Sequence, residues 1–316
     1  MNTVTVTTSA RLHIGFFDLE RNATCKFGSL GLSIASPCTQ VALTKSEKTL
    51  FSVNCSENDV KIFENIAELL NIRQQFSLNI IQSIPRHAGL GSGTQMALAI
   101  GAGLNQLFNL GLTVPQIAKL TKRGNRSGIG IAAFEHGGFL MDNGRMKNEG
   151  LPEITTRIPF PETWRVLLVQ DSTHVGVHGA AELQAFEQLK TAQGNLRKLV
   201  EQQMLPALQR ADLFAFGAIM SDLQAYNGDY FAPIQGGRFA SQDVANVLQS
   251  MQKNGASCVG QSSWGPTGFA IVENEVCGLN LLSQSQRQFA DQTNIRFQMV
   301  RGNNAGASIK MNHLES

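Results

Sequence analysis

The segment from residue 76 to residue 108 constrains the fold of this chain more than any other. Apolar and polar residues alternate over Phe76–Ile84, which predicts a β-strand. Three glycines, Gly89, Gly91 and Gly93, then fall within five residues. Directly after them, apolar residues recur at helical spacing over Met96–Phe108. The chain must therefore turn sharply from a strand into the first turn of a buried helix.

This glycine-rich loop has the chemistry of an anion cradle. Glycine permits a positive-φ path that turns successive backbone amides toward one point. The helix that follows adds unpaired N–H groups and a partial positive charge at its N-terminus. Ser92 and Thr94 add hydroxyl donors, and Arg86 adds a charge. The loop lacks the Gly-Lys-Ser/Thr ending of a Walker loop, and a plain strand-to-helix turn is the alternative, but the combined context favours anion binding.

The rest of the chain predicts an α+β protein in two layers. Val and Thr alternate over Thr3–Thr8 as in a strand, whereas residues 178–251 look mostly helical apart from a predicted loop at Asn227–Gly237. Asn58 is the expected N-cap of an early helix. Three of the nine prolines fall in Leu151–Thr163, which we take as the boundary between two lobes, residues 1–160 and 161–316.

Composition and charge argue against several classes of protein. The net charge of +2 argues against a protein that covers a nucleic-acid backbone. No run approaches the ~20 apolar residues needed to cross a bilayer, and the threonine-rich N-terminus does not resemble a signal peptide. The five scattered cysteines contain no C-x-x-C pair, so neither a disulfide framework nor a zinc site is expected. We therefore expect a cytoplasmic protein without membrane or nucleic-acid partners, and a homodimer stays open.

Several separated motifs, in the right order, resemble one enzyme superfamily. Pro85–Gln95 resembles the second motif of GHMP kinases, a proline followed by Gly-Leu-Gly-Ser-Ser, and Ser9–Gly15 and Gly260–Gly268 stand where the other motifs fall. The loop reads Ser92-Gly93-Thr94 where a kinase has two serines, which loosens the case for ATP. Further blocks resemble the β-ribofuranosylaminobenzene 5′-phosphate synthase family more closely than any kinase: Arg11–His13, Gly28–Leu32, Arg126–Gly130, Glu135–Phe139 and Gly260–Pro266.

The resemblance implies both a fold and a reaction. The fold is that of GHMP kinases, with an N-terminal ribosomal-protein-S5-domain-2-like lobe and a C-terminal ferredoxin-like lobe. Members of the family join 5-phosphoribosyl 1-diphosphate to 4-aminobenzoate or 4-hydroxybenzoate and release carbon dioxide and diphosphate, an early step toward tetrahydromethanopterin in one-carbon metabolism. The resemblance therefore places a diphosphate, accompanied by Mg²⁺, at the glycine loop. The predicted phosphate- and diphosphate-binding residues are Arg86, Gly89, Leu90, Gly91, Ser92, Gly93, Thr94 and Arg126.

Three residues near the N-terminus form the predicted catalytic group. Arg11 and His13 alternate with apolar neighbours, so they share one face of a strand, where they suit a phosphate or carboxylate ligand. A solvated strand face is the alternative, and the resemblance favours the functional interpretation. Asp18 follows the same strand and is the candidate ligand of Mg²⁺, or a group that stabilises a cationic ribose carbon. An ordinary strand-end aspartate is an equal alternative for Asp18.

The predicted pocket for the aromatic substrate lies near the C-terminus. Trp264, one of two tryptophans, falls in a loop with Ser262 and Ser263, where its ring can form a wall for a planar substrate. A tryptophan that fills a gap in the core is the competing interpretation. His178, at the start of a predicted helix, is assigned to the same pocket.

Further alternatives stay open at this level. Of the basic cluster Lys122, Arg123 and Arg126, only Arg126 is assigned to the site, because a cation that complements a helix dipole explains Lys122. An ATP-dependent GHMP-type small-molecule kinase is the second functional hypothesis, and a ligand- or nucleic-acid-binding module is the third. The expected transferase reaction passes through an oxocarbenium-like transition state and needs no covalent nucleophile.

Overall fold

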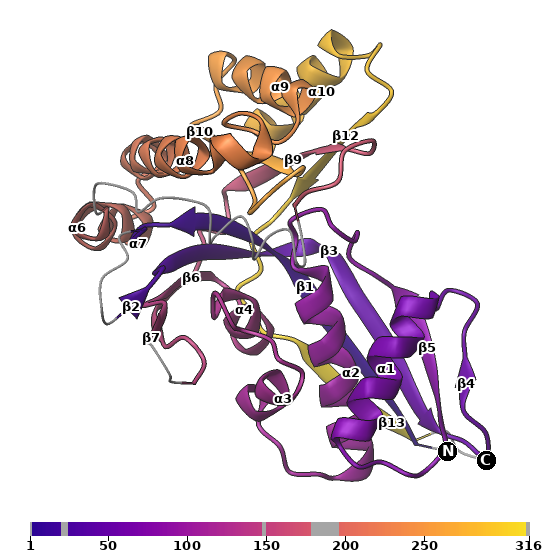
Figure 1. Ribbon diagram of the computed structural model, residues 1–316. Helices are drawn as coiled ribbons and strands as arrows, with labels where there is room; N and C mark the ends of the chain where they lie inside the picture. The colour runs from indigo at the N-terminus through magenta and orange to yellow at the C-terminus, as the bar shows by residue number, and fades with distance from the viewer. Residues whose placement is uncertain (1, 20–24, 147–149, 178–195, 314–316) are drawn as a thin grey trace.

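Two β-sheets organise the chain. The computed structural model describes residues 2–19, 25–146, 150–177 and 196–313 (Figure 1). The first sheet has seven strands and the second has four, and a short two-stranded ribbon, β2 (Cys25–Lys26) with β7 (Arg145–Met146), lies apart from both.

The first sheet is built around two long antiparallel strands, β1 (Asn2–Phe16) and β3 (Ser29–Lys45). In β1 the side chains of Val4 and Val6 are buried, whereas Thr3, Thr5 and Thr7 are half-buried, which is the alternation of a strand with one face on a core. The register of the β1–β3 pair shifts between His13 and Gly15, so the strand is irregular where it enters the site described below. The other strands are β4 (Leu50–Phe51), β5 (Phe76–Gln82), β6 (Phe139–Asp142), β8 (Ile154–Ile158) and β13 (Ser308–His313).

Four helices lie on one side of this sheet (Figure 1): α1 (Glu57–Leu69), α2 (Ser92–Phe108), α3 (Val114–Leu120) and α4 (Ile129–Glu135). α2 packs directly on β1 and β3, and α1 and α3 pack on α2. Glycine permits the close approach, because a Cβ added to Gly103 would lie 2.3 Å from the Leu43 side chain. The packing of α2 therefore fixes where its N-terminus, and with it the glycine loop, is placed.

The second sheet has the order β10 (Cys258–Gln261), β11 (Gly268–Val272), β9 (Arg165–Asp171) and β12 (Ile295–Val300), all antiparallel. Leu167 and Val169 face α9 (Gln242–Lys253) and α10 (Glu275–Gln288) in one core. Val166 and Leu168 point to the other face, into a core shared with the first sheet and with α8 (Leu213–Gln235). The segment before α8 consists of α6 (Arg197–Leu199), the π-helical turn η1 (Val200–Met204) and α7 (Leu205–Gln209).

Most of the predicted elements are confirmed. The α+β class is confirmed, and so are the strand predicted over Phe76–Ile84 and the helix that ends at Phe108. β13 comes from the far end of the chain and pairs with β1, so the first sheet contains strands from both ends of the sequence. The division into lobes near residue 160 stays a prediction. Within the described residues, no helix combines the length and the apolar character needed to cross a membrane.

Two element predictions are wrong. The N-cap of α1 is Ser56 rather than Asn58, because Ser56 and Asp59 form a reciprocal capping box. The segment Asn227–Gly237 is not a loop, because α8 continues through it to Gln235. Tertiary contacts hold the helix through this segment, since Asn227 binds the backbone of Phe16.

The contact between α8 and β1 predicts a stability effect. The Phe16 N–H donates to Asn227 Oδ1 at 2.8 Å, and Asn227 Nδ2 donates to the Phe16 carbonyl at 2.8 Å. Asn227→Ala leaves both buried backbone groups without these partners, so we expect the free energy of unfolding to fall by about 2–4 kcal/mol. Urea unfolding measures this change in the free energy of unfolding. The control is Asn246→Ala on the exposed side of α9, with an expected change within about 0.5 kcal/mol. Equal urea midpoints for the two variants would contradict the assignment.

Candidate active site

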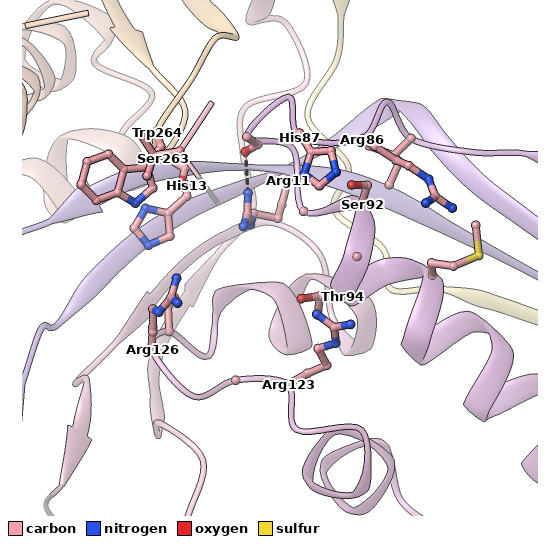
Figure 2. A pocket seen from close by; sticks show the side chains of 18 of the residues that line it. Arg11, His13, Arg86, His87, Ser92, Thr94, Arg123, Arg126, Ser263 and Trp264 are labelled. Carbon is pink, nitrogen blue, oxygen red and sulfur yellow. Dashed lines mark hydrogen bonds between the residues drawn. The ribbon is translucent and has the colours of Figure 1, made fainter. Parts of the chain in front are cut away.

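A cavity of about 540 Å³ lies where the glycine loop, β1 and the loop of Trp264 meet (Figure 2). β1 contributes Arg11 and His13, and the glycine loop contributes Gly89 and Gly91–Thr94. The loop between α3 and α4 contributes Lys122–Ser127. Further lining residues come from α8 and from the loops that flank the second sheet: Val177, Phe231, Gln261, Ser263, Trp264 and Gly265.

The glycine loop enters α2 through left-handed backbone. The φ angles are 75° at Gly89 and 83° at Gly91. α2 begins at Ser92, and no side chain caps it at Gly91. The Thr94 N–H already donates to the Gly91 carbonyl at 3.1 Å, so the N–H groups of Ser92 and Gly93 are those that a helix end leaves for a ligand.

Three segments converge on the carbonyl of Gly89. Arg11 Nη1 and Ser262 Oγ both donate to it at 2.7 Å. Ser262 Oγ also accepts the His13 N–H at 2.9 Å, which ties β1 to the same point. A Cβ added to Gly89 would lie 2.3 Å from the Ser262 carbonyl oxygen, so only glycine fits this crossing. Ser262 thus lies behind the cavity wall, and Leu90 is buried there too.

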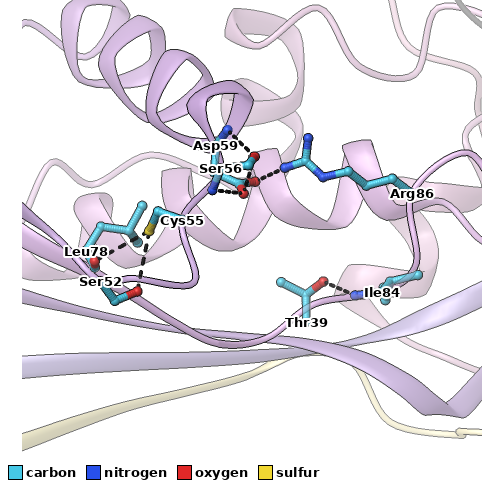
Figure 3. Close-up of polar contacts among 8 residues, drawn as sticks. All are labelled: Thr39, Ser52, Cys55, Ser56, Asp59, Leu78, Ile84 and Arg86. Carbon is cyan, nitrogen blue, oxygen red and sulfur yellow. Dashed lines mark hydrogen bonds and ion pairs between the residues drawn. The ribbon is translucent and has the colours of Figure 1, made fainter.

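Arg86 lies at the far end of the cavity from Trp264, and its charge is already paired. Its guanidinium forms an ion pair with Asp59 (Figure 3). The Asp59 carboxylate also accepts from the backbone and the hydroxyl of Ser56 in the capping box of α1. The sequence reasoning assigned Arg86 to the anion because the two are close along the chain, and it missed Asp59.

A buried carboxylate positions the loop that carries Arg126. Asp142 accepts hydrogen bonds from the hydroxyls of Ser29 and Ser127 at 2.7 and 3.0 Å. It also accepts the N–H groups of Gly128 and Gly144, both at 2.8 Å. These contacts fix the chain just after Arg126, whose guanidinium points toward His13 in Figure 2. The sequence indicated only a turn at Asp142.

His13 is held neutral at physiological pH. Burial, and then the charge of Arg11, lower the pKa of its imidazole from the ordinary value of 6.5 to about 3. Its ring centroid lies 4.8 Å from that of Phe16. A neutral imidazole offers the cavity one hydrogen-bond donor and one acceptor, but it is a weak base.

Aromatic rings form the end of the cavity near the second sheet. Trp264 is 5% exposed and packs on Phe231, with ring centroids 4.5 Å apart. Trp264 therefore fills a gap in a small apolar cluster and also contributes to the cavity lining. Phe231 is only half-buried and lines the cavity from α8. It escaped the sequence reasoning because its segment was taken for a loop.

The predicted metal ligand does not fit the cavity. Asp18 is buried, is not among the residues that line the cavity, and has a carboxylate oxygen 3.7 Å from Arg197 Nη2. Among the described lining residues, Asp59 is the one carboxylate, and it pairs with Arg86. On the glycine loop itself, the hydroxyls of Ser92 and Thr94 are the side-chain oxygens that face Mg²⁺ beside a bound diphosphate. His178 lies outside the described residues.

Two family models match the chain. "GHMP kinases N terminal domain" matches residues 59–138 and "GHMP kinases C terminal" matches residues 204–288, together just over half of the chain. β-Ribofuranosylphenol 5′-phosphate synthase of Archaeoglobus fulgidus is 29% identical over 86% of this chain and 88% of its own length. The protein of that name from Methanothermobacter thermautotrophicus is 27% identical over 85% and 89%. A 4-diphosphocytidyl-2-C-methyl-D-erythritol kinase from Geobacillus kaustophilus is 28% identical over 72% of this chain and 69% of its own.

Solved structures share the fold at low identity. Lactococcus lactis galactokinase complexed with galactose has a TM-score of 0.72 and 14% identity, and the match covers 97% of this chain and 95% of that one. The structure "MDDEF in complex with MVAPP, AMPPCP and Magnesium" has a TM-score of 0.67 and 17% identity, over 99% and 100% of the two chains. The predicted GHMP-kinase fold is confirmed.

The neutral His13 predicts a pH dependence of stability. The pKa of His13 is about 3 in the folded protein and 6.5 in the unfolded chain. At a pH between these two values the unfolded chain binds a proton at His13 and the folded protein does not. His13 therefore lowers stability as pH falls below 6.5, by up to about 1.4 kcal/mol per pH unit.

Urea unfolding of the protein and of His13→Gln, at pH 7 and at pH 5, measures this contribution. Other groups titrate in both proteins, so the difference between the two curves isolates His13. We expect the His13→Gln variant to gain stability relative to the parent on going to pH 5. A difference that stays constant between the two pH values would show that His13 is protonated in the folded state.

Proposed function

Because this chain belongs to the GHMP kinase superfamily and is similar to β-ribofuranosylphenol 5′-phosphate synthases, we propose that it is a phosphoribosyltransferase of that type. It joins 5-phosphoribosyl 1-diphosphate to 4-hydroxybenzoate and releases carbon dioxide and diphosphate, on the route to tetrahydromethanopterin. The observation that carries the proposal is one cavity that combines an anion cradle with an aromatic wall. A donor with a diphosphate and an acceptor with a ring need these two surfaces side by side.

The donor binds at the first-lobe end of the cavity. In the proposed arrangement the N–H groups at the start of α2 hold the diphosphate, with the hydroxyls of Ser92 and Thr94 beside it. When bound with the diphosphate, Mg²⁺ supplies further neutralisation of the leaving group. As the bond between ribose C1 and the diphosphate oxygen lengthens, charge grows on the oxygens that the loop already faces. Fixed donors aimed at developing charge are an efficient source of rate enhancement.

The acceptor binds at the aromatic end. Phe231 and Trp264 offer the faces on which its ring packs. The ring carbon that carries the carboxylate attacks ribose C1, and the C–C bond forms as the diphosphate leaves. Carbon dioxide then departs, and its electron pair restores the aromatic ring. In place of the phosphate predicted from the sequence, we assign Arg126 to the carboxylate, because its guanidinium points toward His13 and the aromatic end of the cavity in Figure 2.

His13 orients a substrate and does not move a proton. With a pKa of about 3 it is too weak a base at neutral pH for general-base catalysis. The proposed reaction needs no proton transfer, because carbon dioxide leaves the ring in place of a proton.

The choice of 4-hydroxybenzoate over 4-aminobenzoate follows the relatives, whose name specifies a phenol. The remaining proposals are a cytoplasmic location and a homodimer.

An ATP-dependent small-molecule kinase is the second candidate. The similarity to 4-diphosphocytidyl-2-C-methyl-D-erythritol kinase favours it. Phosphoryl transfer by kinases, however, uses carboxylates to hold metal ions and to orient the nucleophile. The described lining of this cavity has one carboxylate, Asp59, and Arg86 already pairs with it. This distribution of charge supports a reaction that handles anions without a carboxylate base.

One assay separates these functions. The protein is incubated with Mg²⁺, 5-phosphoribosyl 1-diphosphate and 4-hydroxybenzoate labelled in its carboxyl group, and released carbon dioxide is counted. We expect release that depends on the donor. A parallel reaction with ATP and candidate alcohols measures ATP consumption. ATP consumption without release of carbon dioxide would replace the transferase with the kinase.

A pair of glycine variants tests whether the glycine loop acts in that assay. Gly91→Asp places a carboxylate in the cradle, where it repels a diphosphate, so we expect turnover to be lost. Gly111→Asp is the matched control, because Gly111 has a similar φ of 70° and open space around it. Both variants place a Cβ on left-handed backbone and add one negative charge, and the Cβ at position 91 also approaches the Arg11 side chain to 3.2 Å. Equal loss of turnover in the two would show that strain, and not the cradle, explains the effect.

The aromatic end predicts a selective effect on the acceptor. Phe231→Leu removes a ring face that contacts both the cavity and Trp264. We expect the KM for 4-hydroxybenzoate to rise roughly threefold to tenfold, while the KM for the donor changes little. The acceptor, but not ATP, is also expected to perturb Trp264 fluorescence, and Trp264→Phe removes that signal. Trp164 is 2% exposed in the core and serves as the internal control. Equal changes in both KM values would refute the assignment.

A further inference from the structure

Arg123 enters the cavity from the turn between α3 and α4. The backbone passes through the left-handed region on both sides of it, with φ angles of 54° at Lys122 and 80° at Gly124. A Cβ added to Gly93 would lie 3.5 Å from Arg123 Nη1. Figure 2 shows the guanidinium against the turn of α2 that carries Thr94. The side chain therefore faces the first turn of α2, beside the glycine loop.

The Arg123 side chain has no protein partner within the described part of the chain. Its Nε is sealed from solvent and forms no hydrogen bond there. Burial lowers the pKa of the guanidinium, as expected for a charge taken out of water without a counter-ion. Two other arginines of the cavity differ, since Arg11 donates to Gly89 and Arg86 pairs with Asp59.

An unpaired, half-buried cation destabilises a folded protein. The loss of hydration is normally offset by a counter-charge and by hydrogen bonds, and neither is present for Arg123 among the described residues. The left-handed backbone at Lys122, which is not a glycine, adds strain. Strain and uncompensated charge concentrate at functional sites. The missing partner of Arg123 is therefore an anion that enters the cavity.

We propose that Arg123 binds the anion held by the glycine loop and stabilises the charge of the diphosphate leaving group. The identity of that anion rests on the proposed function, whereas the need for an anion follows from the geometry. When the bond between ribose C1 and oxygen breaks, its electron pair stays on the diphosphate, so negative charge grows beside Arg123. A planar guanidinium donates two parallel hydrogen bonds to phosphate oxygens, which the ammonium group of a lysine does not reproduce.

Calorimetric titration with inorganic diphosphate, with and without Mg²⁺, tests the proposal on the full chain. We expect Arg123→Met to weaken diphosphate binding roughly tenfold to a hundredfold, and Arg123→Lys to fall between that variant and the parent. The matched control is Lys119→Met, which removes the same charge from the exposed face of α3 and leaves the affinity unchanged.

The melting temperature of the ligand-free variants distinguishes binding from structure. Arg123→Met removes an uncompensated charge, so its melting temperature is expected to equal or exceed that of the parent. A structural arginine would behave in the opposite way, with a lower melting temperature and an unchanged diphosphate affinity. That result overturns the proposal, and so does a parent protein that binds no diphosphate.

Failure of this inference is distinguishable from failure of the proposed function. If diphosphate binding depends on Arg123 but no carbon dioxide is released, the proposed reaction is wrong and the anion site stands. If carbon dioxide is released and Arg123→Met retains the parent's diphosphate affinity and KM for the donor, the role of Arg123 is refuted and the reaction stands.

Discussion

The carbonyl of Gly89 is the point on which the site depends. Arg11 from β1 and Ser262 from the second lobe both donate to this one oxygen at 2.7 Å. Two donors on one carbonyl fix the peptide plane, and with it the left-handed turn that aims the start of α2 into the cavity. Ser262 also binds the backbone of His13. The glycine loop, β1 and the loop of Trp264 are therefore one rigid unit, although they lie far apart in the sequence.

The charges around this unit follow from its burial. Arg11 donates a hydrogen bond to the Gly89 carbonyl. Burial, and then the charge of Arg11, lower the pKa of the nearby His13 and keep it neutral. Arg86 is neutralised by Asp59. Arg123 and the N-terminus of α2 then supply positive potential to the centre of the cavity, against a single carboxylate in the described lining. Such a cavity attracts polyanions and disfavours chemistry that relies on a carboxylate base.

The sequence predicted the local features of the site and missed those made by tertiary contacts. The strand before the glycine loop and the helix from residue 96 to 108 follow from the spacing of apolar residues, and the three glycines indicated the loop between them. Phe231 was missed because Asn227–Gly237 was predicted to be a loop. The hydrogen bond that holds the helix there, between Asn227 and Phe16, spans 211 positions of sequence. Arg86 was assigned to the anion because Asp59, 27 residues earlier, gave no sign of being its partner. Arg123 was not assigned to the site, because only the structure shows that its side chain has no hydrogen-bond or ion-pair partner among the described residues.

The division of the cavity suits the proposed C–C bond formation on a fold shared with kinases. The cradle comes from the first-lobe side, on α2 and the turn before α4, whereas the ring faces come from α8 and the loop after β10. The hydrogen bonds of Arg11 and Ser262 to the Gly89 carbonyl set the distance between the cradle and the ring faces. A reaction in which one substrate loses a diphosphate and the other loses carbon dioxide needs no proton shuttle, so its barrier responds to alignment and to fixed charge. A site with a neutral histidine, a paired aspartate and an arginine that has no partner among the described residues suits that requirement. It suits phosphoryl transfer to an alcohol less well, because a base and a metal-binding carboxylate would have to be added to the same walls.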